Sequence, residues 1–192
     1  MTDKLTAQDL ANRIELIESM MREGRQTTGR WGWAFILWGA AYLAASAWSI
    51  YDPTGRPWAV LMPIATILTA ALSRRARSKH PNSTHSRSIG ALWSGAGITL
   101  LLVLFALSLS GHYQFHAFVA IIGGVLGMTN FVSSMILRWR AQLFCAFVWW
   151  GAALAGACLS EQVGGYCFLA ATFLAQIVFG AYVMIAEGRS RA

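Results

Sequence analysis

Long apolar stretches alternate with short polar segments along most of the chain. Six stretches lack Asp, Glu, Lys and Arg and can each cross a bilayer, because a transmembrane helix needs about 20 residues, with a range of roughly 17–25. The pattern predicts an all-α, polytopic membrane protein of six transmembrane helices that pair into three hairpins. The predicted spans are residues 31–51, 57–73, 88–111, 114–137, 141–160 and 164–186.

The second stretch is the shortest of the six, and it begins at Pro57 and contains Pro63. An internal proline removes a backbone hydrogen bond and kinks a helix, but neighbouring helices accommodate such a kink within a membrane. We therefore expect this stretch to cross the bilayer, with a kink at Pro63.

Basic residues are distributed unevenly among the connections. Of the 15 Lys and Arg residues, 14 lie before the first stretch, in the segments 74–87 and 138–140, or in the tail 187–192, and Arg56 alone lies elsewhere. Basic residues favour the cytoplasmic side of a membrane, so both termini are expected to be cytoplasmic. The preference for Arg over Lys is a sign of a GC-rich bacterial genome, which makes the inner membrane the expected location.

The net charge of +7 could also suggest nucleic acid as a partner. A nucleic-acid-binding surface, however, needs basic residues gathered on one folded face, whereas these residues occupy short breaks between apolar runs. We therefore expect the lipid bilayer, and no nucleic acid, as a partner.

Residues 1–30 have a different pattern, which predicts a cytoplasmic amphipathic helix followed by a linker. Leu10, Ile14, Ile17 and Met21 recur at steps of three and four and so form one stripe of a helix. Residues 1–23 of this leader contain five acidic and three basic residues, which argues against attraction to anionic lipid. The stripe is expected to pack on a protein surface through residues 5–22: the chain's own cytoplasmic loops, a second copy in a homo-oligomer, or another membrane or cytoplasmic protein.

Small residues in the fourth and fifth stretches are candidate helix-packing positions. Gly123 and Gly127 form a GxxxG motif, and Gly151 and Gly156 belong to small-xxx-small pairs. Small residues let helix backbones approach closely in lipid, where association depends on van der Waals contact. Packing within the chain is the first expectation, and an interface between protomers is the alternative.

Polar uncharged residues are densest near the cytoplasmic end of the fourth stretch, at Thr129, Asn130, Ser133 and Ser134. They could line a polar passage, or they could form interhelical hydrogen bonds of modest strength. Coupled transport usually requires an ionisable residue within the membrane, and the stretches contain no Asp, Glu, Lys or Arg. This weakens transport without excluding a channel or facilitator.

The remaining chemistry-bearing residues suggest no catalytic centre. His112 and His116 are one helical turn apart, but two ligands without a nearby carboxylate make a poor metal site. Cys158 and Cys167 both lie near the outer end of the last hairpin, where they could bridge or remain free. We therefore expect no catalytic, cofactor-binding or metal residues, and no cofactor.

Related strings begin at Trp38, Trp93 and Trp150, one in each odd-numbered stretch, and they leave open whether the hairpins are true repeats. In helix number and length the chain is similar to small bacterial acid-resistance membrane proteins built from three hairpins, but no shared motif carries functional residues over. The leading hypothesis is a non-catalytic accessory, stress-related or sensory membrane protein that acts through helix–helix association. The alternative is a small channel or facilitator for ions or small solutes.

Overall fold

The computed structural model describes residues 9–10, 12–19, 31–77, 84–109 and 114–190, and all regular structure within these ranges is helical. Short turns connect α2 to α3, α5 to α6 and α6 to α7, and the last helical segment contains a π-helical section, η1, between two α-helices. The elements are α2 (Gly32–Ser49), α3 (Arg56–Arg77), α4 (Thr84–Leu109), α5 (Phe115–Leu137), α6 (Arg140–Cys158), α7 (Glu161–Thr172), η1 (Phe173–Val178) and α8 (Phe179–Ser190).

Five of the described helical segments are long and apolar enough to cross a membrane. Their length and composition identify a multi-pass helical membrane protein, as the apolar pattern predicts. The expected helix in the second stretch is present, and α3 runs through Pro63 without a break. The five segments are Arg56–Arg74, Arg87–Leu107, Phe115–Leu137, Arg140–Cys158 and Glu161–Ala186.

Helix α2 covers most of the first predicted span but is not among these five segments. It is 18 residues long, and its Trp, Tyr, Gly and Ser residues give it a lower mean hydropathy than the other spans. Trp and Tyr prefer the interfaces of a bilayer to its centre. The sixth crossing therefore remains a prediction.

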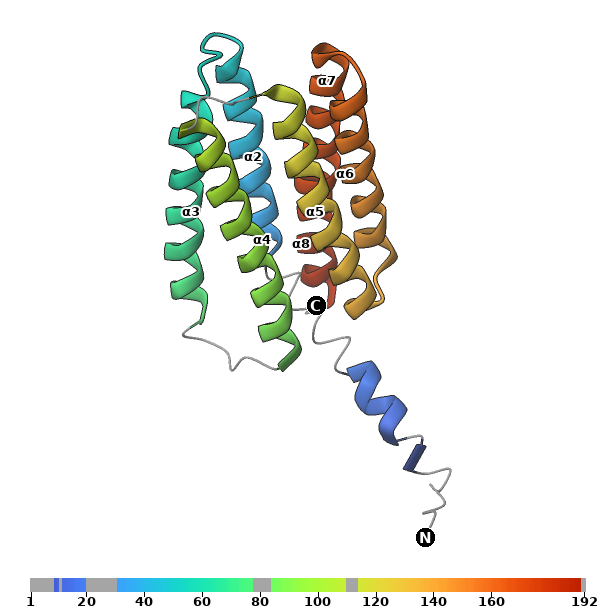
Figure 1. Cartoon of the computed structure of the whole chain (residues 1–192). Helices are drawn as coiled ribbons and strands as arrows, with labels where there is room; N and C mark the ends of the chain where they lie inside the picture. The colour runs from blue at the N-terminus through green and yellow to red at the C-terminus, as the bar shows by residue number, and fades with distance from the viewer. Residues whose placement is uncertain (1–8, 11, 20–30, 78–83, 110–113, 191–192) are drawn as a thin grey trace.

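The helices form a closed ring. Each helix from α2 to α6 contacts the helix that follows it in the sequence. The last helical segment, from α7 to α8, returns to contact α2. Figure 1 shows these helices side by side along one common direction, with α7, η1 and α8 forming a continuous rod. The short turns make sequence neighbours antiparallel, which is the usual arrangement of a helical bundle.

Aromatic side chains from several helices fill much of the interior. The Trp58 ring of α3 packs on Tyr42 of α2 at 5.8 Å and on Phe118 of α5 at 4.5 Å between ring centroids, and Phe168 of α7 joins them. Trp58 is 7% exposed, and its indole N–H donates to the hydroxyl of Ser49 at 3.1 Å. The Trp58 ring is therefore a core residue with a satisfied polar atom.

The two sides of the ring are packed to different extents. Half of the apolar segment of α5 is buried inside the bundle, against 17% of the apolar segment of α4. The contact between α5 and α6 is the most extensive in the bundle, whereas α3 and α4 touch only slightly. The α3–α4 side therefore presents most of its apolar surface to the surroundings, as lipid-facing helices do.

Candidate functional site

The α5–α6 contact depends on glycines. A Cβ atom added to Gly123 would lie 2.7 Å from the carbonyl oxygen of Trp149, and one added to Gly127 would meet the Trp150 indole. Two of the candidate packing positions therefore allow α5 to lie directly against α6, because a larger side chain would force the backbones apart.

Gly156 and Gly151 occupy opposite environments on α6. Gly156 is buried between Val119 of α5 and Gly164 of α7, so three helices meet at one small residue. Gly151 is exposed, and an added Cβ would meet no described atom within 4 Å. The structure thus brings Gly123, Gly127 and Gly156 together along one seam and leaves Gly151 outside it.

A second glycine seam joins the first helix to the last, and the sequence did not single it out as an interface. Gly39 of α2 lies against Gln176 and Ile177 of η1. Gly32 and Gly180 face each other, since a Cβ added to Gly180 would lie 2.9 Å from the carbonyl oxygen of Gly32. These contacts join residues more than a hundred positions apart, and no local pattern identifies such partners.

The four polar residues of α5 are buried, and three of them bond to their own helix. Thr129 donates to the carbonyl oxygen of Val125 and Ser134 to that of Phe131, each at 2.7 Å. The Nδ2 atom of Asn130 donates to the carbonyl oxygen of Leu126 at 2.8 Å. Such local bonds satisfy polar side chains in an apolar environment without a partner helix.

Several buried polar atoms nevertheless lack a hydrogen-bond partner. An unpaired buried donor or acceptor costs about 1–3 kcal/mol, so a concentration of such atoms needs a functional or structural reason. Gln142 and Gln176, two polar residues within the predicted spans, are both buried. The atoms are Asn130 Oδ1, Ser133 Oγ, Gln142 Nε2 and Oε1, Trp149 Nε1, Thr172 Oγ1 and Gln176 Oε1.

The π-helical segment η1 places Gln176 in the interior. The N–H of Phe179 donates to the carbonyl oxygen of Leu174, five residues back, so this turn is wider than an α-helical turn. Ala175 and Gln176 are the buried residues of the segment. Single π-turns inside α-helices often occur at functional positions, and this one lies where the Cβ of Gln176 packs against Gly39 of α2.

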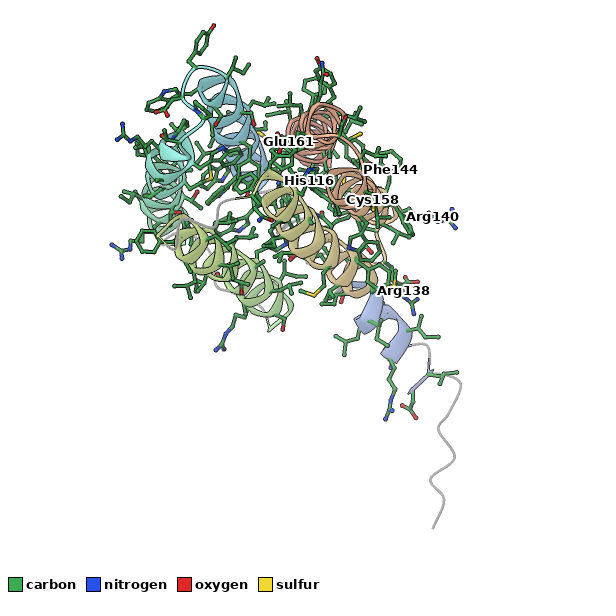
Figure 2. All side chains as sticks on the ribbon, turned by 45° about the horizontal axis from the view of Figure 1, so that its top comes forward. His116, Arg138, Arg140, Phe144, Cys158 and Glu161 are labelled. Atoms are coloured by element: carbon green, nitrogen blue, oxygen red, sulfur yellow. The ribbon has the colours of Figure 1, made fainter. Side chains whose placement is uncertain are left out.

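His116 joins α5 to α6 at the end of the bundle where Glu161 lies (Figure 2). Its Nδ1–H donates to the carbonyl oxygen of Gly156, in the last turn of α6, at 2.6 Å. The last four carbonyl groups of a helix have no partner within it, so His116 caps α6 from α5. Figure 2 shows His116 and Glu161 at one end of the bundle and Arg138 at the other.

The turn between α2 and α3 holds an ordered carboxylate. The Thr54 hydroxyl donates to Asp52 Oδ1 at 2.5 Å, and the Thr54 backbone N–H donates to the same oxygen at 3.1 Å. These bonds stabilise the charged form, and together with the charge of Arg56 they lower the pKa of Asp52 below its usual value.

The thiols and potential metal ligands are dispersed. Cys145 is buried, Cys158 is exposed and Cys167 is partly buried, and all three are free. Within the described ranges, no three His, Cys, Asp or Glu side chains gather as metal ligands. His112 lies outside those ranges, so its pairing with His116 is not described.

The leader is helical over residues 12–19, and residues 9–10 are also helical. Leu10, Ile14 and Ile17 are each more than half exposed, so the described part of the chain does not cover this stripe. Met21 lies outside the described residues. The expected partner surface for the leader therefore stays a prediction.

Comparison with known proteins identifies no relative: no family model, no curated protein and no solved structure matches this chain.

Proposed function

We propose that this chain is a six-span protein of a bacterial inner membrane, with both termini in the cytoplasm, that acts without catalysis through helix–helix association. In this proposal it serves as an accessory, stress-related or sensory component. The fourteen-to-one division of basic residues supports the sidedness. The sixth crossing is α2, whose glycine contacts with the last helical segment suit a neighbouring span.

One observation carries the association: α4 contains glycines with open space where a side chain would lie, and two of them, Gly90 and Gly95, are exposed. Added Cβ atoms on Gly90, Gly95 and Gly97 would meet no described atom within 4 Å. Glycine costs about 1 kcal/mol relative to alanine inside a helix in water and gives no packing advantage against fluid lipid chains. Small residues in membrane helices instead favour a close approach by another helix.

Cysteine cross-linking tests this association with a second copy as the first partner. In a background with Cys145→Ala, Cys158→Ser and Cys167→Ser, we expect Gly95→Cys to form an oxidant-dependent dimer of twice 21.0 kDa in proteoliposomes. Ile67→Cys on α3 is the control, because Ile67 is 67% exposed and lies at a similar depth by the antiparallel order of α3 and α4. Equal cross-linking at both positions would contradict an α4 interface.

The alternative function is a small channel or facilitator, which the buried polar residues of α5, α6 and η1 favour. Flux of ions or small solutes into liposomes containing the purified protein tests it. Selective or saturable flux would replace the accessory role, whereas flux equal to that of protein-free liposomes would remove the alternative.

A further inference from the structure

The α5–α6 contact places Ser133 opposite Gln142. Gly156 of α6 lies against Val119 of α5. Ser133 follows Val119 by 14 residues and Gln142 precedes Gly156 by 14, and 14 residues make about four helical turns. Because α5 and α6 are antiparallel, Ser133 and the Gln142 amide lie at the same level on facing sides of the helices.

Ser133 lies almost one turn beyond Asn130, on the same buried face of α5. Asn130, Ser133 and Gln142 are each 0% exposed, and each has a polar atom without a partner. The unpartnered groups are two amide oxygens, one NH₂ group and one hydroxyl. Together they present both acceptors and donors to one region between the helices.

The charge of the surrounding helices limits what this region can bind. Neither Phe115–Leu137 nor residues 141–158 contain Lys, Arg, Asp or Glu, and the Arg138 and Arg140 side chains between these ranges are exposed, so an ionic ligand would have no buried counter-charge on α5 or α6. An ion that is buried without a partner is strongly disfavoured, whereas a neutral polar molecule needs only hydrogen bonds. The mixture of donors and acceptors requires a ligand that offers both.

We propose that Asn130, Ser133 and Gln142 form an intramembrane binding site, the α5–α6 amide site, for a small uncharged molecule that both donates and accepts hydrogen bonds. Water and a small primary amide share this chemistry. The site lies in the half of the bundle that contains Arg138, so its shortest route is from the predicted cytoplasmic side. It does not depend on association through α4.

Thiol accessibility tests the site in the full chain. In the cysteine-free background in native membranes, we expect 2-hydroxyethyl methanethiosulfonate, a small neutral reagent, to modify Ser133→Cys at least about tenfold faster than Ala152→Cys, a ratio that corresponds to about 1.4 kcal/mol in free energy. Ala152 is the matched control because it is also buried, at 3% exposed, but belongs to the hydrophobic core that contains Phe118 and Phe168. Gln142→Cys serves as a second reporter if Ser133→Cys does not fold.

Competition then identifies the occupant. Slower modification in acetamide, but not in N,N-dimethylacetamide, which has no N–H donor, assigns a primary amide solute. Rapid modification that neither compound slows assigns water. Equally slow modification of both reporters and of Ala152→Cys, in variants that elute as the parent chain does, would overturn the site.

Discussion

At the residue scale, several polar side chains of the bundle form hydrogen bonds with their own helix. Thr66, Thr69 and Thr129 each donate to the carbonyl oxygen four residues before them. Bonds of this kind need no tertiary partner, so they suit residues that face lipid or apolar neighbours. The bond from His116 to Gly156 differs, because it joins separate helices and depends on how they pack.

We predict that His116→Ala lowers the free energy of unfolding by about 1 kcal/mol, because it leaves the Gly156 carbonyl oxygen without its donor. Unfolding by denaturing detergent in mixed micelles measures the loss. His116→Asn is the control, since the Asn Nδ2 can occupy nearly the position of the imidazole Nδ1. Equal destabilisation by both substitutions would show that ring packing matters more than this hydrogen bond.

Asp52 should titrate below its usual range, and Thr54 should be the main reason. We predict that Thr54→Ala raises the Asp52 pKa toward its usual value by removing the hydroxyl bond, while Thr54→Ser preserves the low value. Carboxyl chemical shifts followed against pH by NMR measure this difference. An Asp52 pKa that is unchanged in Thr54→Ala would contradict the assignment.

The same pKa shift has a definite sign for stability. Because the folded-state pKa is lowered, the contribution of the turn is present above the unfolded value of about 3.9 and is lost as the pH falls through the folded pKa. Asp52→Asn should therefore remove this loss of stability at acidic pH. It should also remove the contribution that the charged Asp52 makes to stability near neutral pH.

At the element scale, glycines decide which helix faces come together. The periodicity of small residues identified Gly123, Gly127, Gly151 and Gly156 as candidates, but periodicity alone could not separate the buried positions from the exposed Gly151. That separation requires the rotation of each helix about its axis, which the contacts of whole neighbouring helices determine. For the same reason, the Gly32, Gly39 and Gly180 seam could not be identified from local sequence.

We predict opposite results for two alanine substitutions on α6. Gly156→Ala should destabilise the bundle by about 1–3 kcal/mol, because its Cβ would lie 2.7 Å from the Val119 Cβ and the helices must separate. Gly151→Ala meets nothing and should be neutral or stabilise the helix by up to about 1 kcal/mol. Unfolding free energies of both variants in the same detergent provide the comparison, and equal losses would contradict this packing.

The π-helical segment is an element that the sequence did not indicate. Phe173–Val178 reads as an ordinary apolar helix segment, and nothing in its residue types requires a wider turn. The wider turn shifts the rotation of α8 relative to α7 and so allows buried faces on both sides of it. This rotation accompanies the contacts that η1 and α8 make with α2 and α6, which are distant from this segment in sequence.

At the scale of the whole molecule, topology depends on whether α2 crosses the membrane. With six crossings, the turn at Thr54–Gly55 lies opposite the connection between α3 and α4, and both termini share one side. With five, the leader and the tail would lie on opposite sides. The ring closure between α2 and the last helical segment favours six, because both helices then share the same depth.

We predict that alkaline phosphatase inserted after Gly55 is active, whereas the same enzyme fused after Ala192 is inactive and a fluorescent protein at that position is bright. The expectation follows from the position of the basic residues, which remain on the cytoplasmic side. Enzyme assays and fluorescence in intact bacterial cells make the measurement. Activity of the phosphatase after Ala192 would reverse the sidedness.

The sequence by itself determined the class of protein and the approximate limits of the helices, because the solvent imposes an apolar length and a charge distribution on each span independently of the others. Only the tertiary structure decided that Trp58 is in the core, that Gly151 faces outward and that Asn130 and Gln142 are both fully buried. Those outcomes depend on how each helix is rotated about its axis and on which other helices it contacts. Both follow from packing between segments that are distant in sequence, which the apolar pattern of one span does not encode.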